Sequence, residues 1–373
     1  MVGAGVIARS AVVLSTRKKM ILEDLGYNLE LENFRKSQKL DAFEVGRVIS
    51  EHKERYVVKT SEKEYDGEII GNLRFTAHHR SDFPAVGDWV AVSKYDDNKV
   101  LIHSIFPRKT IIERQAVGKQ GEKQIIATNV DYAFIVQSVD RDFNINRIER
   151  YLAICYTSNV SPIIVLNKID LINDEELSGL VAKIEERIER VPIIPISNES
   201  QKGFEKLKLI IEEGRTYCLL GSSGVGKSTL LNNLSGKLLM KTNMLSTSTN
   251  KGRHVTSHRE LIILEDGGIL IDNPGMREVG IADSKEGLEI TFNEIVKLSK
   301  GCKFKDCTHT TEVDCAVLKA VESGAIDKLS YENFLKMERE KEYFESTVAE
   351  KRKKDKGFGK MIKNYKKSNY KKF

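Results

Sequence analysis

The sequence predicts a multidomain protein with a small N-terminal β-barrel, a central α/β domain and a helical C-terminal module. Short strands separated by turn residues crowd into residues 43–105, strands alternate with helices after Pro107, and helices return beyond about residue 284, where three of the five cysteines lie within 14 residues. A length of 373 residues suits two or three domains. We predict an N-terminal extension, a barrel, an α/β domain, a helical module and a tail, at 1–42, 43–108, 109–284, 285–345 and 346–373.

Charge is unevenly distributed along the chain. The whole chain has 60 Lys and Arg against 54 Asp and Glu, a formal charge of +6. Residues 351–373 hold eleven Lys and Arg against one acidic residue, Asp355, which leaves residues 1–350 with a net charge of −4. A basic, disordered tail on a slightly acidic body is typical of a segment that contacts a polyanion, and a purely solubilising end is the alternative.

Composition excludes several classes of protein. With 40% apolar residues the chain can bury a core, so wholesale disorder and collagen are excluded. No window reaches the roughly 18 continuous apolar residues of a membrane span, and the positive charges Arg17, Lys18 and Lys19 follow the first apolar stretch, whereas a signal peptide has them before it. Five cysteines are too few for a disulfide scaffold. We expect a cytoplasmic monomer that needs no membrane.

The first folded segment reads as a five-stranded barrel. The expected strands are 43–50, 55–60, 65–70, 86–93 and 100–105. An oligonucleotide-binding (OB) barrel is our choice, and an SH3-like barrel fits the pattern almost as well. A loop of this segment contains His78, His79 and Arg80, which could touch nucleic acid, although an exposed polar loop is the preferred reading.

The central segment has the pattern of a parallel sheet covered on both faces. Residues 132–139 and 161–167 are nearly continuous apolar strands, and further strands are expected at 191–197 and 216–221. Helical spacing predicts helices at 146–158, 174–189 and 204–213. In such a domain ligands bind at the carboxyl ends of the strands.

The strongest chemical signal is the G-x₄-G-K-S pattern between a predicted strand and a predicted helix. Its glycines allow backbone N–H groups to converge on phosphate oxygens, and the helix N-terminus adds its positive dipole end. Lys227 would reach the β- and γ-phosphates, and Ser228 would ligate Mg²⁺. The predicted phosphate-binding residues are Gly221, Ser222, Ser223, Gly224, Val225, Gly226, Lys227, Ser228 and Thr229.

A second pattern predicts guanine as the base. The four residues Asn167, Lys168, Ile169 and Asp170 directly follow the apolar strand residues 163–166. A carboxylate at Asp170 can accept two hydrogen bonds from the N1 and N2 groups of guanine, a donor pair that adenine lacks. Ser197 lies where a second base-contacting loop would fall, and an ordinary turn there is the alternative.

A third pattern concerns the metal and the γ-phosphate. Asp272 begins a D-x-x-G sequence after the strand 268–271, so Asp272 can hold Mg²⁺ through a water and the Gly275 N–H can sense the γ-phosphate. Thr256 is our choice for the second hydroxyl ligand of Mg²⁺, with Thr247 and Thr249 as rivals. Met276 occupies the place of the glutamine that orients water in Ras-type enzymes, so intrinsic hydrolysis should be slow or should use another group.

The order of these motifs predicts a circular permutation. The N-K-x-D sequence precedes the P-loop, whereas an ordinary GTPase has it last. The D-x-x-G segment therefore leads directly into the C-terminal module, and nucleotide-dependent movement would be transmitted there.

The C-terminal module contains a C-x₄-C-x-H-x₅-C cluster. Cys302, Cys307, His309 and Cys315 supply three thiolates and one imidazole, the ligand set of a closed, structural, tetrahedral Zn²⁺ site. The other two cysteines, Cys155 and Cys218, lie in apolar contexts and are expected in the core.

In this order, a barrel, a permuted GTPase and this cysteine cluster resemble the small-ribosomal-subunit-dependent GTPase family called RsgA or YjeQ. The resemblance covers roughly residues 43–342 and rests on residues 84–90, the N-K-x-D and P-loop sequences, residues 252–254, the D-x-x-G sequence and the cysteine cluster. Val255 and Asn273 depart from the family pattern, and the first leaves the choice of Mg²⁺-ligating threonine open.

The resemblance implies an activity and partners. It implies a ribosome-stimulated GTP hydrolase acting in late maturation of the small ribosomal subunit, with Mg²⁺ and one structural Zn²⁺, whose barrel and zinc module contact rRNA. It also implies that His254 takes over the work of the missing glutamine. The alternatives are an RNA-binding scaffold with a regulatory GTP pocket and a permuted GTPase that acts on another RNA.

Overall fold

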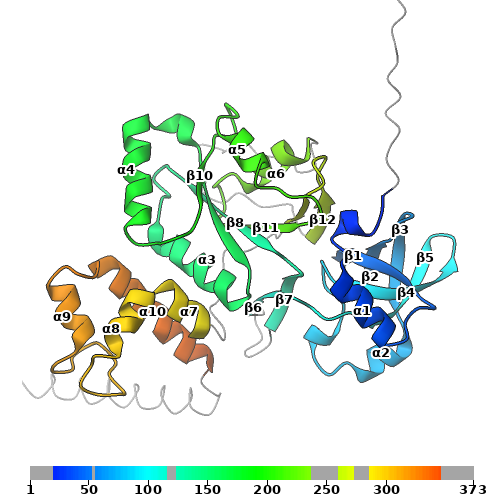
Figure 1. The fold of residues 1–373 in the computed structure, drawn as a ribbon, viewed down its shortest axis with the longest axis horizontal. Helices are drawn as coiled ribbons and strands as arrows, with labels where there is room; N and C mark the ends of the chain where they lie inside the picture. The colour runs from blue at the N-terminus through cyan, green and yellow to red at the C-terminus, as the bar shows by residue number, and fades with distance from the viewer. Residues whose placement is uncertain (1–19, 53–54, 116–122, 237–258, 273–284, 346–373) are drawn as a thin grey trace, which may run out of the picture.

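The computed structural model describes residues 20–52, 55–115, 123–236, 259–272 and 285–345. A β-barrel, a central α/β domain and a helical module follow one another along the chain, and α3 lies between the central sheet and the helical module (Figure 1). An eleven-stranded sheet runs through the first two parts in the order β10-β9-β8-β11-β13-β12-β1-β2-β3-β5-β4. Within the described ranges, no helix combines the length and the apolar character that crossing a membrane requires.

Five strands close the barrel, as the sequence predicts. They are β1 (Glu44–His52), β2 (Arg55–Lys59), β3 (Glu64–Ile69), β4 (Trp89–Asp96) and β5 (Lys99–Ile105). β1 pairs with both β2 and β4, while β3 pairs in parallel with β5, and these pairings close the ring. The parallel β3–β5 pair requires the chain to cross between strands, which matches the Greek-key OB barrel chosen above. In β3 every second residue is buried, so one face of the strand forms the barrel core.

The segment before the barrel covers one side of it. A short turn of 3₁₀ helix, η1 (Glu23–Leu25), and α1 (Leu29–Ser37) place Tyr27 against Trp89 at 5.1 Å between ring centroids and Phe34 against Phe106 at 5.2 Å. Buried Arg47 donates to the carbonyl oxygens of Leu25, Gly87 and Asn129, so one guanidinium joins this segment, the barrel and the connection to the central domain.

The central sheet has the expected parallel strands. β10 (Ile193–Pro195), β9 (Ser161–Asn167), β8 (Tyr132–Ser138), β11 (Thr216–Leu220) and β13 (Ile269–Asp272) are parallel, and β12 (Arg259–Ile263) pairs antiparallel with β13. On one face pack α3 (Ile145–Thr157) and α4 (Asp174–Glu185), and on the other α5 (Phe204–Lys208) and α6 (Lys227–Ser235) (Figure 1). Cys155 and Cys218 are buried in this core, as predicted.

Some elements differ from the prediction. The helices expected at 174–189 and 204–213 end at Glu185 and Lys208. A separate two-stranded hairpin, β6 (Ile111–Gln115) with β7 (Lys123–Thr128), connects the barrel to the central domain and was not predicted. Its apolar residues Ile112 and Ile126 enter the core of the central domain, so tertiary packing fixes the hairpin.

The helical module is docked on the central domain through α3. The module consists of α7 (Lys285–Thr291), α8 (Asn293–Ser299), α9 (Ala316–Glu322) and α10 (Lys328–Glu345). Its hydrophobic cluster includes Ala153 of α3, and a Cβ added to Gly287 would lie 2.1 Å from the Ala153 carbonyl oxygen. Only glycine permits so close an approach of α7 to α3.

A buried polar network reinforces this docking. The carboxylate of Glu149, which is 1% exposed, accepts from Arg187 of the central domain and from Asn333 of α10, at 2.8 and 2.6 Å. Beside it Arg150 pairs with Glu340 of α10. Because a buried charge is tolerated only when it is paired and hydrogen-bonded, these contacts hold α10 in one position on α3.

Candidate nucleotide and metal sites

The P-loop is a turn between β11 and α6. Gly221, Gly224 and Gly226 all have positive φ angles, at 150°, 86° and 98°. A Cβ on Gly226 would lie 2.2 Å from the Asn167 amide nitrogen, so no other residue fits there. The chain thus bends sharply at the carboxyl end of the sheet and enters α6 at Lys227, which gives a loop of backbone N–H groups at a helix N-terminus.

Lys227 and its neighbours lie where the sequence predicts them. The Lys227 ammonium donates to the carbonyl oxygens of Gly221 and Ser222 at 2.8 and 2.6 Å, so it bends back over the loop. Ser228 and Thr229 occupy the next positions of α6. Asp272 ends β13, the strand next to β11, and is 9% exposed. The predicted residues His254, Thr256 and Gly275 lie outside the described residues.

The predicted base-binding residues meet at the ends of two neighbouring strands. Asn167 ends β9, and its amide donates to the Val225 carbonyl oxygen of the P-loop at 2.7 Å. The Ser197 hydroxyl, which follows β10, donates to the Asp170 carboxylate at 2.5 Å. The loop predicted from the weak Ser197 signal therefore lies beside Asp170. Ile169, which immediately precedes Asp170, is buried and so fixes the short 3₁₀ helix Ile169–Leu171 that carries Asp170.

Three further residues at this site, Asn198, Asp140 and Arg147, were not predicted. Asn198 donates from its backbone N–H to the Asn167 side chain at 3.2 Å and from its amide to the Gly226 carbonyl oxygen at 2.9 Å, so it links the second base loop to the P-loop. In the sequence Asn198 is only the middle residue of Ser197-Asn198-Glu199, a weak match to the usual Ser-Ala-Lys.

Asp140 is the second residue that was missed. It accepts from the ammonium of Lys168 at 2.8 Å. Burial works to raise the pKa of Asp140, but Lys168, the Asp142 N–H and the Ser138 hydroxyl outweigh it and lower that pKa, so the carboxylate stays ionised. Asp140 directly follows the strand expected at 132–139, and this position is the sequence feature that could have predicted it.

Arg147, at the start of α3, also contacts the P-loop. Its guanidinium donates to the Ser222 hydroxyl at 3.0 Å and to the Asp142 carbonyl oxygen at 3.4 Å. The helix that receives the C-terminal module therefore also touches the phosphate-binding loop.

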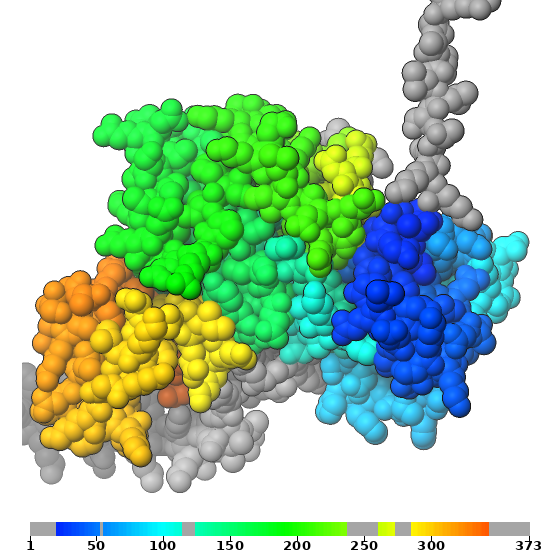
Figure 2. All heavy atoms as spheres, in the orientation of Figure 1, coloured from blue at the N-terminus to red at the C-terminus, as the bar shows by residue number. Residues whose placement is uncertain are grey.

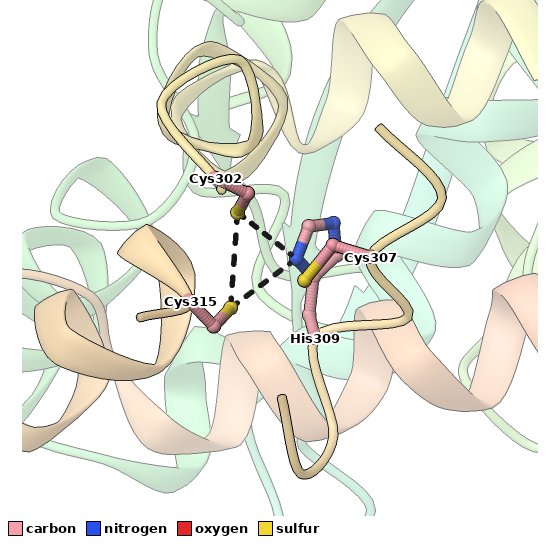
Figure 3. Close-up of side chains that lie close together, drawn as sticks. All are labelled: Cys302, Cys307, His309 and Cys315. Atoms are coloured by element: carbon pink, nitrogen blue, oxygen red, sulfur yellow. Dashed lines mark hydrogen bonds between the residues drawn. The ribbon is translucent and has the colours of Figure 1, made fainter. Parts of the chain in front are cut away.

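The four predicted zinc ligands converge in the helical module (Figure 3). Cys302, Cys307 and His309 lie in the segment between α8 and α9, and Cys315 immediately precedes α9. Their ligand atoms all lie within 4.8 Å of one another. Cys302 Sγ is 3.8 Å from Cys315 Sγ and 3.6 Å from His309 Nδ1, and His309 Nδ1 is 3.4 Å from Cys315 Sγ.

These separations fit a tetrahedral ion. With Zn–S bonds of about 2.3 Å, the edge of a tetrahedron between two sulfur ligands is about 3.8 Å, and an S–N edge is slightly shorter. The geometry also selects Nδ1 as the ligating nitrogen of His309. The residues present therefore fit one closed, structural zinc ion.

The surroundings of the cluster shift the pKa values of its ligands in both directions. Burial and the neighbouring thiols raise the pKa of Cys307 to about 11. Burial lowers the pKa of His309, which keeps the imidazole neutral, as a ligand must be. Burial opposes thiolate formation at Cys302, yet the N–H groups of Ala316 and Val317 at the start of α9 lower its pKa overall. Tyr331 of α10 donates to the His309 carbonyl oxygen at 2.5 Å and so anchors this ligand, which has a positive φ of 59°.

Comparison with known proteins identifies the family. A sequence model of the RsgA GTPase matches residues 105–282. The small ribosomal subunit biogenesis GTPase RsgA 2 of Listeria monocytogenes serotype 4b (strain F2365) is 43% identical over 87% of this chain and 90% of its own length. The RsgA of Methanosarcina acetivorans is 42% identical over 93% of both chains.

Solved structures agree with this similarity. YjeQ from Thermotoga maritima has a TM-score of 0.58 at 27% identity and covers 79% of this chain and 96% of its own. YloQ, described as a circularly permuted GTPase, has a TM-score of 0.57 at 25% identity and covers 82% and 97%. The P-loop, the preceding N-K-x-D loop and the cysteine cluster thus occur in a chain that belongs to the RsgA family of circularly permuted GTPases and is a GTP hydrolase.

Proposed function

We propose that this GTPase acts in late maturation of the small ribosomal subunit, hydrolysing GTP to GDP and phosphate when it is bound to that subunit. The observation that carries the proposal is the joining of the base loops to the P-loop through Asn167 and Asn198, because it brings the residues expected to bind guanine beside those expected to bind phosphate. The relatives named small ribosomal subunit biogenesis GTPase supply the partner.

The roles of the site residues follow from their chemistry. Asp170, oriented by Ser197, accepts the two guanine donors, and Lys227 neutralises charge between the β- and γ-phosphates. Ser228 and Thr256 would hold Mg²⁺ directly and Asp272 through a water. The bound ion supplies charge stabilisation on the β- and γ-phosphate oxygens. His254 would orient the attacking water, and the Gly275 N–H would contact the γ-phosphate.

RNA binding is divided among three parts of the chain. The barrel and the zinc module would contact rRNA, and the basic residues 351–373 would add a salt-dependent contribution to affinity. The expected location is the cytoplasm, and the expected state is a monomer.

GTP turnover with and without purified small subunits tests this function. We expect small subunits to raise the hydrolysis rate by orders of magnitude, large subunits to have no effect, and His254→Ala to remove the stimulation while GDP binding persists. Lys227→Ala is the control that should lose nucleotide binding. A basal rate equal to the rate with small subunits would contradict the proposal.

The tail is tested separately by deleting residues 351–373. We expect the affinity for small subunits to fall and its dependence on salt to become less steep, since fewer counterions are released. An unchanged salt dependence would assign the tail to solubility alone.

A further inference from the structure

The segment between β8 and α3 lies in the middle of the nucleotide site. We name residues 139–144 the β8–α3 connection. In the sheet, β8 lies between β9, which leads into the predicted base-binding residues 167–170, and β11, which leads into the P-loop, and the three strands are parallel. The β8–α3 connection therefore leaves the carboxyl edge of the sheet between the residues expected to bind guanine and those expected to bind phosphate.

This part of the chain contacts the loops on both of its sides. On the base side, the ammonium of Lys168 pairs with the Asp140 carboxylate at 2.8 Å. On the phosphate side, Arg147 at the start of α3 donates to the Ser222 hydroxyl of the P-loop at 3.0 Å. α3 also receives the helical module, which lies against the central domain in yellow and orange (Figure 2). The β8–α3 connection and the start of α3 thus join the two loops from a third strand.

The two oxygens of the Asp140 carboxylate have different partners. Oδ1 accepts from the Ser138 hydroxyl at 2.8 Å and from the Asp142 N–H at 3.0 Å, which fixes the carboxylate on its own segment. Oδ2 accepts from Lys168. The Lys168 and Asp140 side chains are only 24% and 25% exposed, so water and salt screen this ion pair less than one on the open surface. Asp140 therefore presents a fixed negative charge to a single ammonium group.

Lys168 is constrained at its backbone as well as at its ammonium. Its φ angle of 68° lies in the left-handed region, which costs free energy for any residue with a Cβ and persists only where the surroundings enforce it. On one side Asn167 is tied to the P-loop, and on the other Ile169 is buried. The ion pair with Asp140 fixes the far end of the same residue.

The Lys168 side chain follows the path that a bound nucleotide would take. It starts at the end of β9, two residues before Asp170, and reaches the end of β8, which is the strand nearer to the P-loop. A nucleotide whose base meets Asp170 and whose phosphates meet Lys227 must cross the same edge of the sheet. The position of the ammonium therefore decides where the methylene groups of Lys168 lie beside that nucleotide.

We propose that Asp140 is a positioning residue for guanine-nucleotide binding, which holds the ammonium of Lys168 over the end of β8 and so keeps this side chain in its binding orientation. Lysine loses much rotamer freedom when it is ordered, and a side chain that is ordered in advance loses less of it when the ligand arrives. This inference rests on the proposed guanine site and adds to it a residue outside the N-K-x-D and P-loop sequences.

Isothermal titration calorimetry of the full-length protein with GDP and Mg²⁺ tests the proposal. Asp140→Asn keeps an oxygen for Ser138 and Asp142 but places an amide donor opposite the Lys168 ammonium, so it removes the ion pair and preserves the local turn. We expect the dissociation constant for GDP to rise about 2- to 12-fold, the effect of losing one partly exposed, hydrogen-bonded ion pair.

Asp174→Asn is the matched control, because it removes another aspartate that pairs with a lysine close to the base-binding residues. Asp174 contacts Lys202 at 3.1 Å and is exposed. The control makes the same change in net charge, and we expect it to bind GDP as the wild type does.

A second background shows whether Asp140 acts through Lys168. Lys168→Met removes the ammonium and keeps an unbranched side chain. If Asp140 acts through that ammonium, Asp140→Asn should change the GDP affinity of the Lys168→Met protein by less than about twofold. A purely structural role of Asp140 in its own turn would give the same loss in both backgrounds.

Two results would overturn the proposal. One is an equal GDP affinity of the wild type and Asp140→Asn, and the other is an equal loss in the Lys168 and Lys168→Met backgrounds. Thermal unfolding of each variant checks that it is folded. Failure of the wild type to bind GDP would contradict the guanine site itself, and absence of stimulation by small subunits would contradict the proposed function, so the failures are distinguishable.

Discussion

The hydroxyl of Ser197 donates a hydrogen bond to the carboxylate of Asp170 at 2.5 Å, although 27 positions of sequence separate the two residues. The Ser200 N–H in turn donates to the Ser197 hydroxyl at 3.0 Å, which fixes the direction of the serine. The carboxylate that would select guanine is therefore oriented by the loop that follows the next strand.

Removing this hydroxyl should weaken nucleotide binding. A hydrogen bond to a charged group contributes about 1.5–3 kcal/mol, so we expect Ser197→Ala to raise the dissociation constant for GDP by about 10- to 150-fold. Titration with a fluorescent GDP analogue measures this.

Asp170→Asn should shift the preference from guanine to xanthine nucleotides, and an unchanged preference would argue that Asp170 does not contact the base.

Asn198 should also matter for nucleotide affinity. Asn198→Ala removes the hydrogen bond to the Gly226 carbonyl oxygen, and a neutral hydrogen bond contributes about 0.5–1.5 kcal/mol, so the dissociation constant for GDP should rise by about 2- to 12-fold. Gln201→Ala is the control, since the Gln201 side chain donates to the Asn198 carbonyl oxygen at the surface and not to the P-loop. Equal affinities of the two variants would show that this link is dispensable.

The docking of the helical module should depend on charge pairing at Glu149. Arg187→Met leaves the Glu149 carboxylate buried without its main partner, which should lower the free energy of unfolding by about 3–5 kcal/mol. The double variant Glu149→Met, Arg187→Met removes both charges and should recover most of that loss. Chemical denaturation compares the three proteins, and a double variant as unstable as the single one would indicate that packing dominates there.

Zinc binding by the helical module should depend on pH. Protons compete with zinc for the imidazole and the thiolates, so zinc content should fall as pH falls. Because burial lowers the pKa of His309, that competition at the imidazole begins at a lower pH than it would for an exposed histidine. Metal analysis of protein dialysed at a series of decreasing pH values measures the loss of zinc.

A pair of variants shows whether the cluster is the metal site. Cys302→Ser should release zinc at neutral pH and reduce helical circular dichroism, whereas Cys155→Ala, which alters a buried cysteine outside the cluster, should retain it. Full zinc content in Cys302→Ser would contradict the assignment of the cluster.

Local patterns were sufficient to predict much of the fold and several contacts of the site. The strands that end at Asn167 and Leu220 follow from continuous apolar runs, and the cysteine cluster follows from ligand spacing. In each case the information lies within a few neighbouring residues.

The contacts that were missed depend on distant parts of the chain. Asn198 acts because the fold brings Gly226 to it, and Asp140 because Lys168 reaches back to it. The β6–β7 hairpin was missed because its strands are stabilised by the core they enter. Such contacts can be predicted only when the topology of the fold is known.

The pairing of β1 with β12 has a mechanical consequence. Glu51 of the barrel lies opposite Arg259, the first residue of β12, and Ser50 opposite Glu260. The interval that contains His254 and Thr256 ends immediately before Arg259 in the sequence. β1 and β12 therefore join the barrel and the central domain in one continuous sheet, so a displacement of the barrel relative to the central domain would strain the ladder at the first residues of β12.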